Sequence, residues 1–201
     1  MKLYDFDAPN PKKVRMFAAE KGIRLELEPV AVLDGALQTP EMLAKNPLAQ
    51  VPFLELDDGQ IIRESLAIIE YLEAMHPEPP MLGSKPLERA RIQELDRLAD
   101  LGIMMEAANY VHHMHPFFAS LGPQSSDAAV MANNLLIKKF AVMDAEIGER
   151  TFVAGDHPTV ADCTLYCALE FTAQYGPGVP EDFSNMLRWQ EEFSHRPSAS
   201  A

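Results

Sequence analysis

The chain has 201 residues, of which 47% are hydrophobic, and it carries a formal charge of −13 at neutral pH. This length and apolar fraction are enough for one large or two small globular domains. The acidic balance disfavours nucleic acid and anionic membranes as partners, because both bind concentrated positive charge. No apolar run approaches the roughly 18 residues that cross a bilayer, and the first residues have the pattern of a strand and not of a signal peptide. We therefore expect a globular protein of the cytoplasm.

The first part of the chain has the pattern of a small mixed sheet with helices. The predicted elements are a strand over 2–6, a helix that ends at Lys21, a strand over 25–29, a helix over 40–44, strands over 52–56 and 60–63, and a helix over 65–75. The two later strands flank Asp57-Asp58-Gly59, and Asp-Gly favours a tight hairpin turn. The predicted order is βαβαββα, which describes an α/β domain with a small mixed sheet covered by helices.

The second part of the chain is predicted to be all helical. The segment 76–86 contains four prolines, the last of them Pro86, and a glycine, which indicates a linker, so we expect domains over 1–80 and 81–201. After the linker the apolar residues keep a helical period, broken at Pro116, at "LGPQSS" and at "AGDHP". The run from Thr159 to Asp162 has the form of a capping box at the start of a core helix. The two cysteines, Cys163 and Cys167, follow in that helix and are expected to be buried and reduced.

Two dipeptides of the first part stand where backbone groups are available to a ligand. Val51-Pro52 opens a strand, and taken alone it favours an ordinary strand-start proline. The alternative is a cis bond, which would leave the Val51 backbone facing outward to pair with an extended peptide. Glu64-Ser65 lies at a strand-to-helix junction, where a carboxylate is favoured, although Ser65 can also act as a plain helix cap. Both dipeptides can converge on one edge of one sheet.

Histidines and aromatic residues gather near the end of a long helix of the second part. His112, His113 and His115 lie there, but no Asp, Glu or Cys stands near them at ligand spacing, so no metal site is predicted. Surface or cleft histidines are the favoured interpretation. The neighbouring aromatic residues form the wall of a pocket or belong to the core; they are Tyr110, Phe117 and Phe118.

The ordered set of motifs resembles a glutathione transferase over nearly the whole chain. "NPLAQVPFLELDDGQIIRESLAIIEYLE" is similar to the best-known stretch of that family's thioredoxin-like domain, and "FVAGDHPTVADCTLYCALEF" resembles its C-terminal capping-box helix. The resemblance implies a homodimeric enzyme without a metal, in which the thiolate of glutathione attacks a small electrophile. A non-catalytic binding or interaction protein on the same fold is the alternative.

The resemblance also implies a set of glutathione contacts. The backbone at Val51-Pro52 would pair with the cysteinyl unit, while Glu64 and Ser65 would hold the γ-glutamyl carboxylate and amine. Gln38 and Lys45 stand where the family often places groups for the glycyl carboxylate.

The residue that usually activates the thiol is missing. Ala8 precedes Pro9, where the serine-type members keep a hydroxyl, so the hydroxyl and the redox cysteine are both absent and disulfide exchange is disfavoured. Tyr4 lies in the first strand and is expected to pack inside. One remaining source of thiolate stabilisation is the helix start, where Asn10 can donate from its backbone and its side-chain amide, whereas Pro9 and Pro11 have no N–H.

The other source is His112, which matches a histidine of an atypical fungal and bacterial class. In that class the histidine and a hydroxyl residue one turn earlier hold a water against the sulfur; here the earlier residue is Ala108, with Asn109 next to it. His113 is the alternate candidate, and both histidines can instead simply line a cleft. The electrophile pocket implied by the resemblance comprises Ala8, Tyr110, His113, Phe117 and Phe118.

Overall fold

The computed structural model describes residues 1–120 and 122–201, which form two compact units. The first unit comprises Met1–Met81 with Ser200–Ala201, and the second comprises Leu82–Ala199. Within the described residues, no helix combines the length and the apolar character needed to span a membrane. The first residue of the predicted "LGPQSS" break, Leu121, lies outside the described residues.

A four-stranded mixed sheet forms the centre of the first unit, in the order β2-β1-β3-β4. The strands are β1 (Lys2–Asp5), β2 (Glu26–Pro29), β3 (Phe53–Glu55) and β4 (Ile61–Arg63). Strand β1 runs parallel to β2 and antiparallel to β3, with Leu3 opposite Leu54 and Tyr4 opposite Phe53. Because side chains alternate along a strand, the two leucines face one side of the sheet and the two aromatic rings face the other.

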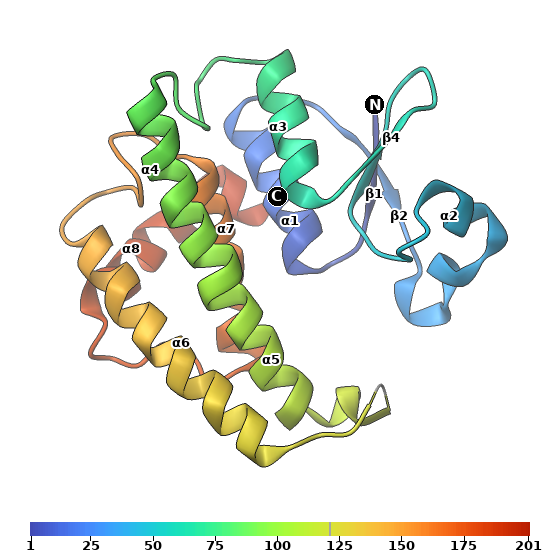
Figure 1. The fold of residues 1–201 in the computed structure, drawn as a ribbon. Helices are drawn as coiled ribbons and strands as arrows, with labels where there is room; N and C mark the ends of the chain where they lie inside the picture. The colour runs from blue at the N-terminus through green and yellow to red at the C-terminus, as the bar shows by residue number, and fades with distance from the viewer. Residues whose placement is uncertain (121) are drawn as a thin grey trace. The chain divides into compact units, whose positions relative to one another are not determined.

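The helices of this unit cover both faces of the sheet. Helices α1 (Pro9–Glu20) and α3 (Ser65–Met75) lie together on one side, and α2 (Pro40–Lys45) lies on the other (Figure 1). Two 3₁₀ turns, Val32–Asp34 and Ala36–Gln38, precede α2. The order of elements confirms the predicted βαβαββα pattern.

A buried ion pair joins the two helices that share a face. The Lys21 ammonium lies 2.6 Å from a carboxylate oxygen of Glu73, and both side chains are almost fully buried. Lys21 follows the last turn of α1, and Gly22 then takes a φ of +66°, the left-handed geometry that ends a helix at the predicted place.

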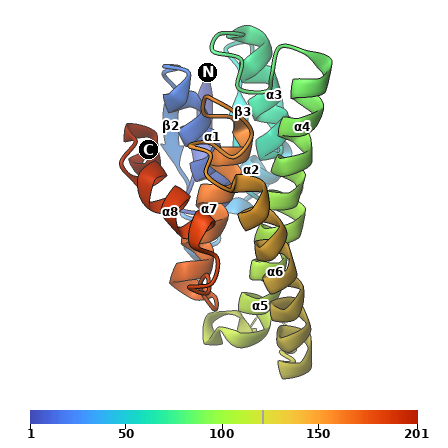
Figure 2. The same ribbon diagram turned by 90° about the vertical axis from the view of Figure 1, so that its left-hand side faces the viewer.

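The second unit is all helical, as predicted. Its elements are α4 (Pro86–Arg97), a π-helical segment (Leu98–Met104), α5 (Met105–Met114), a 3₁₀ turn (Pro116–Ser120), α6 (Ser126–Ile147), α7 (Val160–Tyr175), α8 (Ser184–Ser194) and a 3₁₀ turn (Pro197–Ser200). Figures 1 and 2 both show α6 running alongside α5. Helix α7 is the core helix, because all of its first ten residues are buried, Cys163 and Cys167 among them.

The predicted capping box at the start of α7 is present and completely buried. Asp162 accepts hydrogen bonds of 2.8 Å from the Thr159 backbone N–H, from the Thr159 hydroxyl and from the Val153 backbone N–H. Burial raises the pKa of Asp162 to about 6, against the opposing effect of these donors. One carboxylate therefore fixes both the start of α7 and the loop that leads to it.

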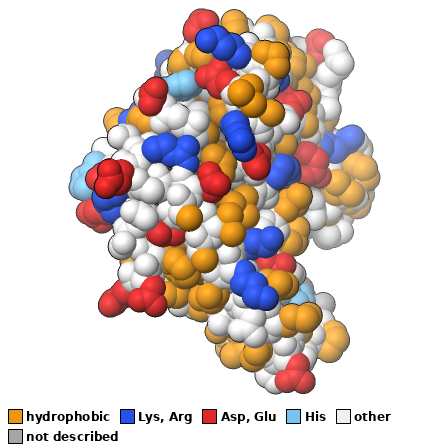
Figure 3. Space-filling view, turned by 60° about the vertical axis from the view of Figure 1, so that its left-hand side comes forward, with side chains coloured by type: hydrophobic (Ala, Val, Ile, Leu, Met, Phe, Trp, Pro, Cys, Tyr) orange, Lys and Arg blue, Asp and Glu red, His pale blue; other side chains and the backbone are white. Residues whose placement is uncertain are grey.

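Some large hydrophobic side chains of the second unit remain on its surface. In the face drawn in Figure 3, hydrophobic groups reach the surface between acidic and basic ones. The exposed examples on the π-helical segment, α5 and α6 are Leu101, Met105, Met114, Val130, Met131, Leu135 and Val142. Leu101 and Met105 are one helical turn apart, as are Met131 and Leu135, so each pair occupies one side of its helix.

Candidate functional site

A small polar pocket lies in the first unit, where four separate segments of the chain meet. The segments are the start of α1, the loop after α2, the residues before β3 and the junction between β4 and α3. The lining residues are Asn10, Asn46, Gln50, Val51, Pro52, Glu64 and Ser65. The volume of about 40 Å³ gives room for one small polar group, such as a carboxylate. Five of the seven are residues to which the sequence assigned a role in handling glutathione.

The Val51-Pro52 peptide bond is cis, and β3 begins only at Phe53. The ordinary strand-start proline, favoured from the dipeptide alone, was therefore the wrong alternative. Asn46 holds the loop before this step, because its amide donates to the Gln50 carbonyl at 2.8 Å and its oxygen accepts from the Leu48 N–H at 3.2 Å. Asn46 is only 3% exposed.

Two lining residues, Asn46 and Gln50, were missed by the sequence reasoning. The dipeptide Asn46-Pro47 was the available signal, because asparagine before proline favours a turn in which the asparagine side chain bonds to nearby backbone.

The junction between β4 and α3 has a strained backbone at Glu64. Its φ is +69°, a conformation that costs a residue other than glycine about 1–3 kcal/mol and is common at binding sites. Glu64 occupies the N-cap position of α3, and its side chain makes no capping hydrogen bond. Ser65 is consequently the first helical residue and not the cap, which corrects the plain-cap alternative. The Glu64 side chain therefore does not occupy the N–H groups at this helix start, and helix starts of this kind favour anions in proteins in general.

The start of α1 offers fewer donors than a typical helix. Ala8 is the N-cap, has no side chain that can cap, and donates its own N–H to the Phe6 carbonyl at 2.8 Å. Pro9 and Pro11 carry no N–H, so Asn10 has the only backbone donor among the first three helical residues. Its side-chain oxygen lies 3.5 Å from the Ser65 hydroxyl, across the pocket.

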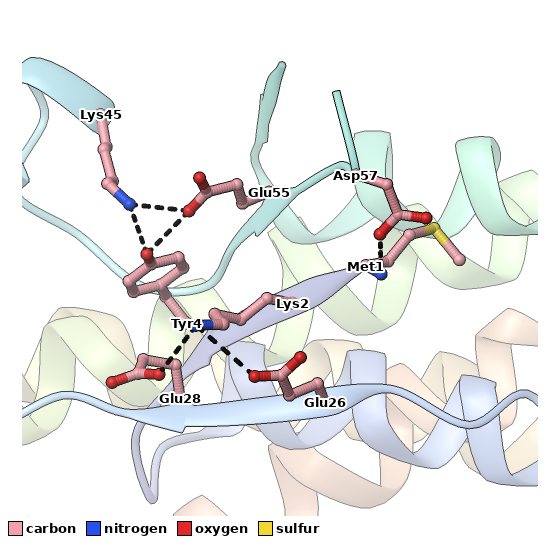
Figure 4. A network of polar contacts seen from close by, with 8 residues as sticks. All are labelled: Met1, Lys2, Tyr4, Glu26, Glu28, Lys45, Glu55 and Asp57. Carbon is pink, nitrogen blue, oxygen red and sulfur yellow. Dashed lines mark hydrogen bonds and ion pairs between the residues drawn. The ribbon is translucent and has the colours of Figure 1, made fainter. Parts of the chain in front are cut away.

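Tyr4 and Lys45 belong to a different polar cluster, outside this pocket. Tyr4 is 6% exposed, as expected from its place in the first strand, and stacks on Phe53 with ring centroids 4.2 Å apart. Its hydroxyl donates to Glu55 at 2.7 Å, and the Lys45 ammonium contacts both the Tyr4 hydroxyl and the Glu55 carboxylate (Figure 4). The hydrogen bond with Glu55 raises the pKa of Lys45, and the same contact lowers the pKa of Glu55.

This arrangement does not bring the two predicted glycyl-carboxylate residues to the pocket. Lys45 directs its ammonium to Glu55, and Gln38 is exposed at the end of the second 3₁₀ turn. Neither residue is among those that line the pocket. A long lysine side chain can reach either side of its helix, and here the nearby carboxylate of Glu55 decides the side.

The predicted histidines of the second unit lie in an aromatic cluster at the end of α5. The His112 ring meets His113 edge-on at 5.4 Å and lies 5.9 Å from Phe118, which in turn contacts Phe117 at 5.1 Å. Tyr110 is half-buried, whereas Phe117 is 56% exposed. Among the described residues, no group of three His, Cys, Asp or Glu side chains is placed to hold a metal ion.

Asn109 does not replace the missing hydroxyl one turn before His112. Its amide donates to Glu106 at 3.3 Å. The π-helical segment ends at Met104, so the turn that carries Ala108 and His112 is regular α-helix. In a regular helix neighbouring residues point about 100° apart, and Asn109 therefore lies off the His112 side.

Comparison with known proteins agrees with the arrangement of elements. The family model of the glutathione S-transferase N-terminal domain matches residues 3–80, and that of the C-terminal domain matches residues 109–197. The chain belongs to the glutathione S-transferase family. Its thioredoxin-like and helical parts are those that the resemblance implied, and membership supports glutathione binding and glutathione transferase activity in general.

Three proteins illustrate the range of this glutathione S-transferase's relatives. Glutathione S-transferase 2 of Saccharomyces cerevisiae is 34% identical over 98% of this chain and 87% of its own length. A solved structure of a glutathione S-transferase domain-containing protein from Marinobacter aquaeolei VT8 has a TM-score of 0.89 and 36% identity, covering 98% of this chain and 99% of that one. Maleylacetoacetate isomerase of Pseudomonas aeruginosa is 39% identical over 80 residues, which is 38% of either chain.

Proposed function

We propose that this glutathione S-transferase conjugates the thiol of glutathione to small hydrophobic electrophiles. The observation that carries the proposal is the convergence of Asn10, Val51, Glu64 and Ser65 on one pocket. They come from three segments of the first unit, and the sequence independently points each of them to glutathione or to its thiol.

The γ-glutamyl group of glutathione is proposed to bind at the start of α3. Its carboxylate would accept from the uncapped N–H groups and from the Ser65 hydroxyl, at the positive end of an 11-residue helix. Its amine would be held by the Glu64 carboxylate. The pocket volume of about 40 Å³ fits such a polar end group, and the remainder of the tripeptide would extend past the backbone of Val51.

The thiol of the bound cysteinyl unit must then be ionised. A free thiol has a pKa near ~8.5, so a site that stabilises the thiolate gains reactive nucleophile at neutral pH. Asn10 is proposed to donate to the sulfur, and His112 to hold a water against it. The thiol proton leaves to solvent, the sulfur–carbon bond forms, and with an aryl halide the halide departs.

The aromatic cluster of the second unit is proposed to contact the electrophile. It offers Tyr110, His113, Phe117 and Phe118, and the exposure of Phe117 leaves apolar surface for a ligand. Ala8 is the corresponding contact proposed from the first unit. Apolar surfaces of this kind discriminate weakly between similar ligands, so the proposal names a class of electrophile and not one compound.

The first experiment combines retention on immobilised glutathione with a conjugation assay on a chromogenic aryl halide. We expect both binding and turnover, and Ser65→Ala should weaken glutathione binding about tenfold, because a hydrogen bond to a carboxylate is lost. Ser184→Ala is the matched control, since Ser184 is also the first residue of a helix and is exposed. Binding without turnover would instead favour the non-catalytic alternative.

A second experiment isolates the proposed role of His112. His112→Ala should raise the pKa of the enzyme-bound thiol, read from thiolate absorbance, while leaving glutathione affinity close to that of the wild type. His195→Ala, which removes an exposed histidine beyond α8, is the control. An unchanged thiolate titration in His112→Ala would remove His112 from the mechanism.

We also propose that the protein acts as a homodimer in the cytoplasm. The exposed hydrophobic side chains on the π-helical segment, α5 and α6 support pairing, because such groups are commonly covered in an interface. Sedimentation equilibrium tests the assembly, and a monomer at all accessible concentrations would contradict it.

A further inference from the structure

Helix α2 is too short to be stable by itself, yet it leads directly into the pocket wall. It has six residues, Pro40–Lys45, and none of them is buried. Isolated helices of this length do not persist in water, so tertiary contacts must hold it. Asn46 and Val51 follow within the next six residues and line the pocket. Contacts that hold the end of α2 in place therefore also hold the side of the pocket formed by Asn46 and Val51.

The first contact at the end of α2 is the Lys45 ammonium. It lies 2.7 Å from the Glu55 carboxylate and also contacts the Tyr4 hydroxyl, so it ties the helix to the two central strands (Figure 4). The side chains of Lys45 and Glu55 are 24% and 29% exposed. Partial burial and the third partner make this pair less screened than an ordinary surface ion pair.

The second contact is made by Arg63 to the backbone of the same residue. Its Nε and Nη2 both donate to the Lys45 carbonyl, at 3.0 and 2.7 Å. A guanidinium at a helix C-terminus satisfies a carbonyl that has no partner within the helix and complements the helix dipole. Arg63 is also the last residue of β4, directly before Glu64. The Arg63 side chain thus joins the end of α2, directly before Asn46, to the end of β4, directly before Glu64.

We propose that Lys45 and Arg63 are positioning residues, which hold the two walls of the glutathione pocket in register without touching glutathione. Lys45 acts through Glu55 and Tyr4 from outside the pocket, and Arg63 acts through the Lys45 carbonyl. The inference rests on the proposed function, because it takes the ligand of the pocket to be glutathione.

The test for Lys45 compares glutathione with its glycyl monoethyl ester, in which the glycyl carboxylate is neutral. A positioning residue affects the two ligands equally, whereas a direct carboxylate contact affects glutathione alone. We expect Lys45→Met to raise the dissociation constants of glutathione and of the ester by the same factor, about five- to tenfold. Glu55→Gln, which alters only the partner outside the pocket, should shift both in the same direction. A loss of affinity for glutathione with unchanged affinity for the ester would overturn the role of Lys45.

The test for Arg63 uses the steady-state constants for glutathione. Arg63→Met should raise KM about fivefold and change kcat less, and Arg63→Lys should restore part of the loss because it returns one donor. Arg91→Met is the control, since Arg91 pairs with Glu94 on the surface of the second unit. The role of Arg63 would be overturned if KM in Arg63→Met stayed within twofold of the wild-type value. It would also be overturned if kcat fell by as large a factor as KM rose.

The two proposals fail in different ways. Absence of glutathione binding in the wild-type protein overturns the proposed function, and the positioning roles with it. If the wild type binds glutathione but the Lys45 and Arg63 variants keep its dissociation constants and KM, only the positioning roles are overturned. Thermal unfolding of each variant is recorded beside the binding data, and the milder Glu55→Gln and Arg63→Lys substitutions decide the matter if a methionine variant does not fold.

Discussion

The buried carboxylate of Asp162 should be among the side chains whose loss most destabilises the second unit. In Asp162→Ala the backbone N–H groups of Val153 and Thr159 lose acceptors at 2.8 Å. A buried donor without a partner costs about 1–3 kcal/mol, and a lost helix cap costs about 1 kcal/mol. Removal also relieves the desolvation cost of burying the charge, so we expect a net loss of about 3 kcal/mol in the free energy of unfolding.

The assay can follow the unit that contains the substitution. The only tryptophan, Trp189, is fully buried in the second unit, and its fluorescence reports the unfolding of that unit. A loss of about 3 kcal/mol corresponds to a fall of about 6–12 °C in the melting temperature for a chain of this size. Urea titration of the same variant gives the free energy directly.

The control is the same substitution in the first turn of another helix. Asp127 lies in the first turn of α6 and is exposed, so Asp127→Ala should cost about 0.5 kcal/mol through the helix dipole. If Asp162→Ala costs less than about 1 kcal/mol, or no more than Asp127→Ala, the account of α7 as a helix fixed by a buried carboxylate is refuted.

Two further predictions concern pH and backbone geometry. Burial raises the pKa of Asp162 from 3.8 to about 6, so between these values the folded chain binds more protons at this carboxyl than the unfolded chain does. Its contribution to the free energy of unfolding should therefore fall as pH rises through that window, by up to about 1.4 kcal/mol per pH unit. Urea titrations of the wild type and of Asp162→Asn at several pH values should show this slope as a difference between the two proteins. Parallel curves of unfolding free energy against pH would contradict it. At Gly83 a Cβ would lie 2.9 Å from the Arg89 backbone nitrogen at a φ of +83°. Gly83→Ala should thus cost about 2–4 kcal/mol in urea unfolding, against about 1 kcal/mol for Gly22→Ala, where the φ is +66° but the space is open; equal losses would show that the close approach is unimportant.

The features that could be predicted from the sequence are those set by residues close together in the chain. The hairpin around Gly59, the stop at Gly22 and the capping box at Asp162 each depend on interactions within a few residues, and all three are present. Val51, Glu64 and Ser65 were assigned to glutathione through a resemblance that spans the whole domain. Asn10 was singled out because Pro9 and Pro11 leave it as the donor at the start of the first helix.

The features that escaped prediction depend on tertiary partners. The direction of Lys45 is decided by Glu55, ten residues later, and by Tyr4, 41 residues earlier. Likewise the π-helical segment Leu98–Met104 interrupts a sequence that keeps an ordinary helical period, and no local signal marks it.

The uncapped start of α1 bears on how this protein can be engineered. Alanine at an N-cap costs about 0.5–2 kcal/mol relative to serine, so a thermostability screen or a consensus design would select Ala8→Ser early. That substitution would also introduce a hydroxyl where serine-type members of the family carry theirs. Stabilisation and a change of chemistry are therefore coupled at this position. Variant libraries that aim to raise thermal stability while preserving the native reactivity should keep alanine at residue 8.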